Sequence, residues 1–382
     1  MEDNKMIIQS RNVYCDGVLK PAQVEIEGDK IKNILPYGNK KADCDYGENW
    51  ILPGLIDIHN HGYHGCDANH ATEEWVREWM AYLPKEGVTS TLAATSSSPR
   101  ATMLKGMENI ARVIDEGCEG THLLGIYSEG PFMCEEFRGA QDVKNLTIPT
   151  REEIDTYQKA CNGHLIYVMV APEMLPDMDV IRYCVSQGIK VTCGHTGASF
   201  AKITEAREAG ARCFTHTFNG MRGLHHREPG VVGAAMYYDD MYAEMIGDGV
   251  HVSFPSMNIL AKAKGPDKLI SVTDSVYFKG FPVGAYESEG QKRYVCEDGV
   301  GRLENGSICG SANRLNVILG REITKANIPY QTAINSCTCN PANMLGFGHC
   351  KGYLRQNYDA DICVLDKDFE VVQTYVSGKE ML

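Results

Sequence analysis

The sequence predicts an α/β protein, a (β/α)8 TIM barrel with a small β-sandwich domain built from both termini. Short apolar runs alternate with helical patterns over residues 53–345, as expected for a barrel of βα units. Residues 1–52 and 346–382 instead show the alternation of β hairpins. Several apolar runs end at a His, Asp or Glu, and a barrel builds its active site from residues at the ends of its strands.

The two terminal segments predict one shared domain. Residues 23–27 and 30–34 alternate polar and apolar side chains around the Gly28-Asp29 turn, and residues 360–365 and 371–376 show a similar β pattern. An isolated hairpin is only marginally stable in water. We therefore expect residues 1–52 and 346–382 to fold together.

The central segment predicts the barrel. We expect its strands at residues 55–59, 88–93, 123–127, 166–170, 190–193, 212–215, 242–247 and 269–273. The expected helices include residues 73–82, 99–116, 177–186, 200–209, 313–326 and 330–338. Ser199 fits an N-cap and Gly210 a stop signal for one of these helices. Residues 276–306 are rich in Gly, Glu and Tyr, and we expect a loop or short hairpin over the barrel mouth.

Composition limits the function. The net charge of -13 argues against a nucleic-acid partner, although local cationic residues can still bind an anionic small substrate. No N-terminal signal pattern and no apolar run near 18 residues is present, so we expect no membrane partner. The fifteen cysteines form no CxxC pair. Their odd number indicates reduced thiols and a cytoplasmic protein.

Four histidines and one glutamate follow predicted strands. His59 and His61 are one residue apart, so their side chains point the same way in an extended strand. Glu129 follows the third apolar run, and His195 and His216 follow the fifth and sixth. One such residue alone is most often only hydrogen-bonded, but this combination predicts a metal site. Imidazole and carboxylate ligands suit zinc or iron, and three protein ligands leave a position for water.

Further polar residues predict the remaining chemistry. Asp274 follows the last strand as an N-cap or, as we favour, as a general acid/base beside the metal. His251 lies some residues beyond the seventh strand, where it can donate to a substrate carbonyl oxygen. Asn219 and Arg227 lie on the sixth βα loop. Arg227 suits bidentate capture of phosphate or carboxylate, or is simply a solvated surface residue.

A set of short motifs covers nearly the whole chain. These motifs are Pro53-Gly54-Leu55-Ile56-Asp57, Glu129-Gly130-Pro131, Gly194-His195-Thr196, Thr215-His216-Thr217-Phe218-Asn219-Gly220-Met221, Arg227-Glu228-Pro229-Gly230, Asp248-Gly249-Val250-His251, Val272-Thr273-Asp274-Ser275, Gly310-Ser311-Ala312 and Asn340-Pro341-Ala342. Together they resemble the amidohydrolase superfamily and, within it, the N-acetylglucosamine-6-phosphate deacetylases.

The resemblance implies roles for these residues. It implies a metal held by Glu129, His195 and His216, with Asp274 as acid/base and His251 touching the acetyl carbonyl. The His59 and His61 pair resembles the two-metal version, in which Glu129 bridges, so one or two ions are expected. The implied substrate contacts are Gln141, Asn219, Gly220, Arg227, the backbone around Phe132 and Met133, and Ile308, Cys309, Gly310 and Ser311. A homodimer is also implied, with the partner subunit helping to close the phosphate pocket.

The chain departs from the family pattern at two places beside the substrate. It has Arg138-Gly139-Ala140-Gln141 where members commonly have Lys-Gly-Ala-His, so an amide replaces an imidazole. It has Asn313-Arg314-Leu315 where Leu-Thr-Met is common. Arg314 then serves an additional anionic group or caps its helix. Strand four ends at Ala171-Pro172-Glu173 rather than at the modified lysine of many other amidohydrolases, which favours the deacetylase branch.

The predicted activity is removal of the acetyl group from N-acetylglucosamine 6-phosphate, giving glucosamine 6-phosphate and acetate. Asp274 would take a proton from water and pass it to the departing nitrogen. The alternatives are an amidohydrolase of another N-acyl hexosamine, such as N-acetylgalactosamine 6-phosphate, or of an N-acyl amino acid. A non-catalytic barrel scaffold is a remote alternative.

Overall fold

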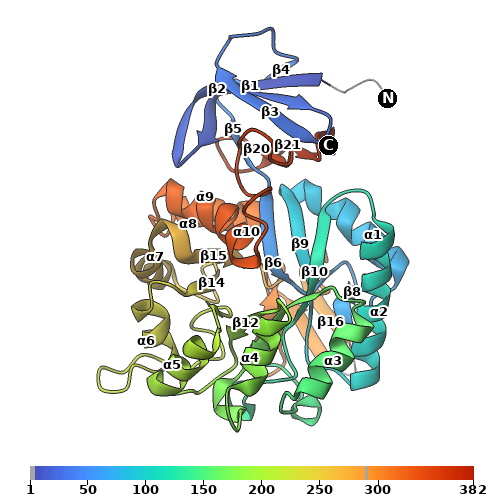
Figure 1. Cartoon of the computed structure of the whole chain (residues 1–382), viewed down its shortest axis with the longest axis vertical. Coiled ribbons are helices and arrows are strands. Elements are labelled where there is room, and N and C mark those ends of the chain that lie inside the picture. The colour runs from blue at the N-terminus through green and yellow to red at the C-terminus, as the bar shows by residue number, and fades with distance from the viewer. Residues whose placement is uncertain (1–4, 289–290) are drawn as a thin grey trace.

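A barrel and a β domain stacked on one of its ends make up the molecule (Figure 1). The computed structural model describes residues 5–288 and 291–382. The β domain lies against the end of the barrel at which strand β6 begins, and the first described residues and the C-terminus lie in it (Figure 1). No helix within the described ranges is long and apolar enough to cross a membrane.

The barrel wall is an eight-stranded parallel sheet with its strands in sequence order. Its strands are β6 (Leu55–Asn60), β9 (Val88–Thr95), β10 (His122–Ser128), β11 (Leu165–Val170), β12 (Lys190–Cys193), β13 (Cys213–Phe214), β14 (Tyr242–Ile246) and β15 (Leu269–Val272). The sheet closes where Asn60 forms a parallel bridge with Ser275 and Asp274 N–H donates to His59 O at 2.9 Å. The predicted TIM barrel is therefore confirmed, and the predicted strand positions agree with the observed ones to within a few residues.

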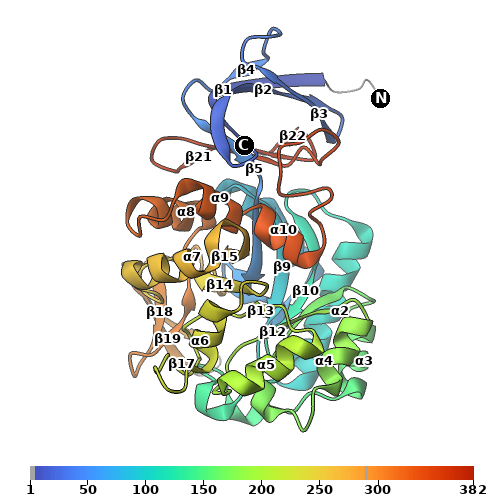
Figure 2. The ribbon, with the colours of Figure 1, turned by 60° about the vertical axis from the view of Figure 1, so that its left-hand side comes forward.

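Helices surround the barrel (Figures 1 and 2). They are α1 (Glu73–Tyr82), α2 (Arg100–Glu116), α3 (Arg151–Ala160), α4 (Asp179–Ser186), α5 (Phe200–Ala209), α6 (Gly230–Tyr237), α7 (Phe254–Lys268), α8 (Leu315–Thr324), α9 (Tyr330–Ser336) and α10 (Cys339–Leu345). Helix α5 has the predicted ends, because Lys202 N–H donates to Ser199 Oγ and Gly210 adopts a left-handed conformation. Its buried residues Ile203, Ala206 and Ala209 form one face, so the helix packs on the sheet through that face.

The two chain ends share one sheet in the β domain, as predicted. Its strands are β1 (Lys5–Cys15), β2 (Val18–Glu27), β3 (Lys30–Pro36), β4 (Cys44–Asp45), β5 (Trp50–Pro53), β20 (Ile362–Leu365), β21 (Val371–Val376) and β22 (Lys379–Glu380). Strand β20 pairs antiparallel with β5, which joins the two ends of the chain. Ile8, Val24 and Ile26 form one buried cluster with Ile362 and Val364. The two halves of the sheet thus pack face to face as a small sandwich.

Residues 276–306 differ from the expected loop or single hairpin. They contribute to a four-stranded antiparallel sheet, β16 (Gly284–Ser288), β17 (Gln291–Val295), β18 (Val300–Leu303) and β19 (Ile308–Ser311). Asp298-Gly299 and Asn305-Gly306 are strong hairpin-turn signals, and each joins two of these strands. The prediction was wrong because these turns divide the segment into short strands. The sheet lies toward the barrel end opposite the β domain (Figures 1 and 2).

A buried ionic network joins the β domain to the barrel. Lys351 Nζ donates to Asp361 Oδ2 at 2.6 Å and lies 2.8 Å from Asp359 Oδ2. His122, the first residue of β10, lies 3.4 Å from Asp361 Oδ1. The side chains of Lys351 and Asp361 are only 7% and 6% exposed. Each charge in this network therefore depends on its partners for compensation.

We expect Lys351→Met to lower the free energy of unfolding by about 3–5 kcal/mol, because it leaves buried carboxylates without their cation. Urea unfolding of the variant and the parent protein measures this difference. Lys367→Met is the matched control, since the Lys367 side chain is 89% exposed. Equal stabilities for the Lys351 variant and the parent would show that the network contributes nothing.

The same network predicts a loss of stability in acid. Burial alone raises the pKa of Asp361, but His122 and Lys351 outweigh it and lower that pKa to about 2. The ordinary value is about 3.9. A lowered pKa in the folded state stabilises the protein above the ordinary value, and this contribution is lost as the pH falls toward 2. Unfolding experiments from pH 5 to 2 should show this loss in the parent protein and a smaller slope in Asp361→Asn.

Candidate metal centre and active site

Strained backbone occurs at three strand ends that the sequence singled out. His195, His216 and Asp274 follow β12, β13 and β15 with φ values of 44°, 29° and 46°. Positive φ is uncommon for residues other than glycine, and such strain concentrates at functional sites. The fold therefore holds these three residues in a conformation that local preference disfavours.

Glu129, His195 and His216 form one buried group of possible metal ligands. Glu129 Oε1 lies 3.2 Å from His195 Nε2 and 2.9 Å from His216 Nε2. The two Nε2 atoms are 3.1 Å apart. One ligand atom from each of three strand ends thus converges on a common centre.

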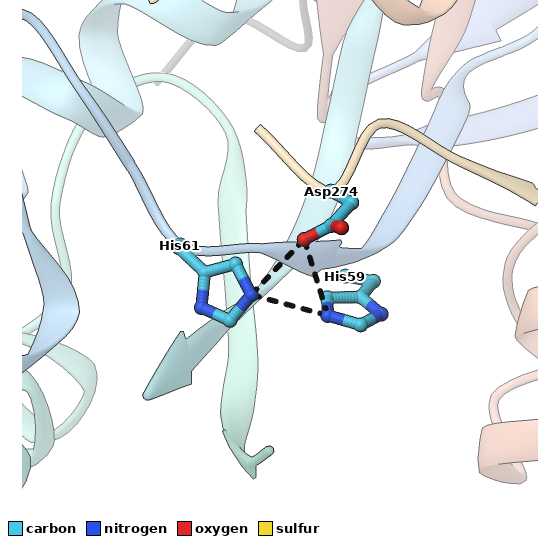
Figure 3. A group of neighbouring side chains, drawn as sticks. All are labelled: His59, His61 and Asp274. Atoms are coloured by element: carbon cyan, nitrogen blue, oxygen red, sulfur yellow. Dashed lines mark hydrogen bonds and ion pairs between the residues drawn. The ribbon is translucent and has the colours of Figure 1, made fainter. Parts of the chain in front are cut away.

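His59, His61 and Asp274 form a second group (Figure 3). The two Nε2 atoms are 3.2 Å apart, and Asp274 Oδ1 lies 3.1 Å from His61 Nε2 and 3.5 Å from His59 Nε2. Glu129 lies 3.4 Å from each of these histidines, through Oε1 to His59 and through Oε2 to His61. Its carboxylate therefore stands between the two groups.

Hydrogen bonds fix the protonation of the imidazoles. His61 Nδ1 lies 2.9 Å from the carbonyl oxygen of Ala94, and His195 Nδ1 lies 2.8 Å from that of Phe137. A carbonyl oxygen only accepts, so Nδ1 carries the proton and the Nε2 lone pair faces the centre. This is the tautomer that metal ligation requires.

The donor geometry fits divalent ions. Bonds of about 2.0–2.1 Å in a tetrahedral site place neighbouring donor atoms roughly 3.3 Å apart. The Nε2 pairs, at 3.1 and 3.2 Å, match that spacing. Without a cation or an added proton between them, the lone pairs of the two Nε2 atoms in each group would face and repel each other. Both groups therefore have the donors, spacing and tautomers to hold an ion.

The electrostatics of the centre favour positive charge. Burial lowers the pKa of His61, but Asp274 and Glu129 outweigh this effect and raise it to about 9. Burial raises the pKa of Glu129, yet the surrounding histidines hold it well below its ordinary value. The carboxylates thus stay ionised and attract cations, whether protons or a metal.

Sequence analysis missed Glu244, which supports both groups. It is fully buried within β14, and its Oε2 accepts from His59 Nδ1–H at 3.0 Å and from His216 N–H at 3.2 Å. Tyr167 O–H donates to its Oε1 at 2.8 Å. The available signal was a carboxylate inside an otherwise apolar strand, because such a charge needs dedicated partners.

His251 faces the pocket with its ring held by Asp248. Asp248 Oδ2 accepts from His251 Nδ1–H at 2.6 Å, and Asp248 Oδ1 accepts from the backbone N–H groups of Val250 and His251 at 2.8 Å each. Because Nδ1 is engaged, the Nε2 edge remains for a substrate. Asp248 was part of a quoted motif, but its orienting role follows only from the tertiary contact.

The pocket above the metal groups has a volume of about 610 Å³, within the usual range for small-molecule sites. The predicted site residues that line it are His61, Glu129, Gln141, His195, His216, Asn219, Gly220, His251, Asp274, Ile308, Cys309 and Gly310. His59, Met133 and Ser311 lie behind its wall, with at most 1% of each residue exposed. Arg227 lies on an exposed loop outside the lining.

Gly220 is required by close packing. A Cβ atom there would lie 2.9 Å from His195 Nδ1 and 3.0 Å from Phe137 O, and the φ of 57° already disfavours other residues. The loop after β13 thus closes directly onto the His195 ring. Arg314 lies at the N-cap position of α8 but makes no side-chain cap hydrogen bond there. Its guanidinium lies 3.0 Å from Glu370, and the residue is not part of the pocket lining.

Several pocket residues were not predicted. They are Asp67, Asn69, Ser96, Ser97, Ser98, Pro99, Asp142, Lys144, Asn145, Val276, Tyr277 and Arg293. Ser96 to Ser98 follow β9, whose end carries no metal-capable residue to mark it in the sequence.

Comparisons with known proteins agree with this geometry. The amidohydrolase family model matches residues 50–381. N-acetylglucosamine-6-phosphate deacetylase of Vibrio furnissii is 33% identical over 92% of this chain and 88% of its own. N-acetylgalactosamine-6-phosphate deacetylase of Escherichia coli O157:H7 is 30% identical over 98% of both chains.

A solved structure also matches this chain over nearly its whole length. It is a mutant N-acetyl-D-glucosamine-6-phosphate deacetylase from Mycobacterium smegmatis in complex with N-acetyl-D-glucosamine-6-phosphate. It has a TM-score of 0.93 and 27% identity, and the match covers 99% of this chain and 100% of that chain. The resemblance expected from the motifs is confirmed. The chain belongs to the amidohydrolase family, in the group that contains the N-acetylglucosamine-6-phosphate deacetylases.

Proposed function

We propose that this protein hydrolyses the acetamide of N-acetylglucosamine 6-phosphate to glucosamine 6-phosphate and acetate. The observation that carries the proposal is the Glu129 carboxylate between two groups of histidines at the base of a polar pocket. The named relatives support the choice of sugar phosphate.

The two groups would hold the metal. Glu129, His195 and His216 would bind one ion, and His59 and His61 a second, with Glu129 bridging. Zinc or iron suits these nitrogen and carboxylate donors. When bound, such an ion acidifies water and polarises the amide carbonyl.

Asp274 would transfer the proton. Its carboxylate lines the pocket beside His61, so it lies where a water and the amide nitrogen can meet. It would accept the proton of the attacking water and then donate it to the nitrogen, because an amide nitrogen leaves poorly without protonation. Its position 3.1 Å from His61 also allows Asp274 to contact the second ion.

His251 would stabilise the charge that develops on the acetyl oxygen. With Nδ1–H given to Asp248, Nε2 donates only in the doubly protonated ring, whose charge the Asp248 carboxylate compensates. Asn219, Gly220, Ile308, Cys309 and Gly310 would bind the sugar phosphate. Met133 and Ser311 would act from behind the pocket wall, since at most 1% of each residue, backbone included, is exposed.

We further propose that Arg227, on its exposed loop, contacts the phosphate, and that the protein is a homodimer in which the partner subunit helps to close the phosphate pocket. The domain boundaries would be residues 1–52 with 346–382 for the β domain and 53–345 for the catalytic barrel. Strand β5 ends at Pro53 and α10 ends at Leu345, which supports this division. All fifteen cysteines are free thiols, which supports a cytoplasmic location.

N-acetylgalactosamine 6-phosphate is the second candidate substrate. It is favoured by Gln141, which stands where the family commonly has an imidazole, and by the relative named for that sugar.

A substrate panel tests the activity. After reconstitution with zinc or iron, we expect the highest kcat/KM for N-acetylglucosamine 6-phosphate, with N-acetylgalactosamine 6-phosphate and unphosphorylated N-acetylglucosamine at least roughly tenfold lower. Acetate release gives the rates. A higher kcat/KM for the galacto sugar would select the second candidate. A metal-loaded protein that releases acetate from none of these sugars would overturn the proposal.

The role of Asp274 is tested by Asp274→Asn. We expect kcat to fall roughly 10²- to 10⁴-fold, because the proton carrier is lost. Elemental analysis should still find bound metal, because Asp274 is not part of the ligand group formed by Glu129, His195 and His216. If the bound metal is lost as well, or if kcat is unchanged, the assignment of Asp274 is wrong.

A further inference from the structure

The pocket spans the whole mouth of the barrel. In the circular strand order β9 is the second strand and β13 the sixth, so their ends lie half a turn apart. The pocket is lined by Asn219 and Gly220 after β13 and by Ser96 to Ser98 after β9. The proposed phosphate site occupies the first side. The residues after β9 on the second side have no role in the chemistry described above.

Asn69 organises the hydroxyl groups on this second side. Its Nδ2 group donates to Ser96 Oγ at 2.8 Å and to Ser98 Oγ at 3.0 Å, while Ser96 N–H donates back to Asn69 Oδ1 at 3.2 Å. Asn69 is only 3% exposed, so this arrangement is fixed. Each serine oxygen accepts from Asn69, and each hydroxyl proton therefore remains to be donated elsewhere.

Gln141 is oriented in the same way. Ser97 N–H donates to Gln141 Oε1 at 3.0 Å, which assigns the oxygen of the amide and leaves Nε2 as a donor at the pocket. Ser97 Oγ is itself buried, and among the described residues it has no hydrogen-bond partner. The protein thus leaves several polar groups beside the metal centre without internal partners.

The charged residues of the pocket outside the metal centre balance one another, which favours a neutral ligand. Lys144 and Arg293 line the pocket together with Asp67 and Asp142. Two cations are opposed by two carboxylates, so no excess of positive charge is available for a second anion. Hydroxyl groups suit this lining, because each one both donates and accepts.

From the described contacts we infer that Ser96 and Ser98, positioned by Asn69, form with Gln141 a second subsite, which binds ring hydroxyls of the sugar on the C3–C4 edge. The inference rests on the proposed function, which places the acetyl group at the metal and the phosphate toward β13. A pyranose has two edges between C2 and C5. Only the C3–C4 edge carries two hydroxyls, whereas the other carries the anomeric hydroxyl and the ring oxygen. A cluster with several hydroxyl-binding groups therefore matches the C3–C4 edge.

Deoxy sugars combined with variants test the subsite. The substrates are N-acetylglucosamine 6-phosphate and its 3-deoxy, 4-deoxy and 1-deoxy analogues. The variants are Asn69→Ala, Ser98→Ala and Gln141→Leu. Ser186→Ala and Gln187→Leu are the matched controls, because both residues lie exposed at the end of α4, outside the pocket lining. Metal content and melting temperature of each variant show that it is folded.

We expect each subsite variant to lower kcat/KM for the full sugar roughly tenfold, mainly by raising KM. Ser98→Ala and Gln141→Leu remove a hydrogen bond to the sugar, and Asn69→Ala releases the serines that it positions. With the 3-deoxy or the 4-deoxy analogue, the parent enzyme should already be slow and the variant should add little further loss. With the 1-deoxy analogue, the tenfold effect of each variant should persist. The two controls should match the parent on every sugar.

Three results would overturn the inference. A variant that lowers kcat/KM by the same factor on all four sugars acts only on the structure. If the loss disappears with the 1-deoxy analogue, the subsite binds the edge of the sugar that carries the anomeric hydroxyl and not the C3–C4 edge. No loss for any variant would mean that the cluster does not touch the substrate. Acetate release by the parent enzyme tests the proposed function separately, and if it fails, calorimetric binding of the same sugars still distinguishes these outcomes.

Discussion

The convergence of four imidazoles on the Glu129 carboxylate is the constraint on which the rest of the site depends. Each of the four Nε2 atoms lies within 3.4 Å of one Glu129 oxygen. Such an arrangement of buried lone pairs and negative charge is unfavourable without a cation. Carbonyl groups and Glu244 accept the outer Nδ1–H groups of three of the rings and so turn their lone pairs inward. The fold thus prepares the centre before any ion arrives.

Closure of the barrel brings the last residue of the centre into place. Asp274 belongs to the end of β15, and it reaches His61 only because β15 and β6 meet at the seam. Asp57, buried in β6, accepts from Thr273 O–H at 2.6 Å and fixes that seam from inside. The β domain holds the start of β6, where Gly54 N–H donates to Asp361 O at 2.8 Å. The β domain therefore contributes to the position of His59 and His61, although it does not line the pocket.

The residues that could be predicted are those marked by local pattern. Histidines and acids that end apolar runs are visible in the sequence, because strand period and strand end are local properties. Glu244 and Asn69 could not be assigned in the same way, since their function depends on partners from distant strands. The four-stranded sheet was missed for a different reason. Its Asp-Gly and Asn-Gly turns are local signals of hairpins, but the Gly-, Glu- and Tyr-rich composition of the segment is also typical of a loop.

Chemistry and specificity are located on different sides of the pocket. A centre that contacts only the acetyl group treats alike all hexosamines that differ at C3 or C4. Discrimination among such sugars must come from groups that touch the ring hydroxyls, and losing one such hydrogen bond changes the rate far more than a change of hydrophobic contact. Gln141 is suited to this task because Ser97 fixes its amide in one orientation. An imidazole there would donate or accept according to its tautomer, whereas this amide nitrogen only donates. In the proposed subsite, Gln141 would therefore alter what the pocket recognises without altering the metal centre.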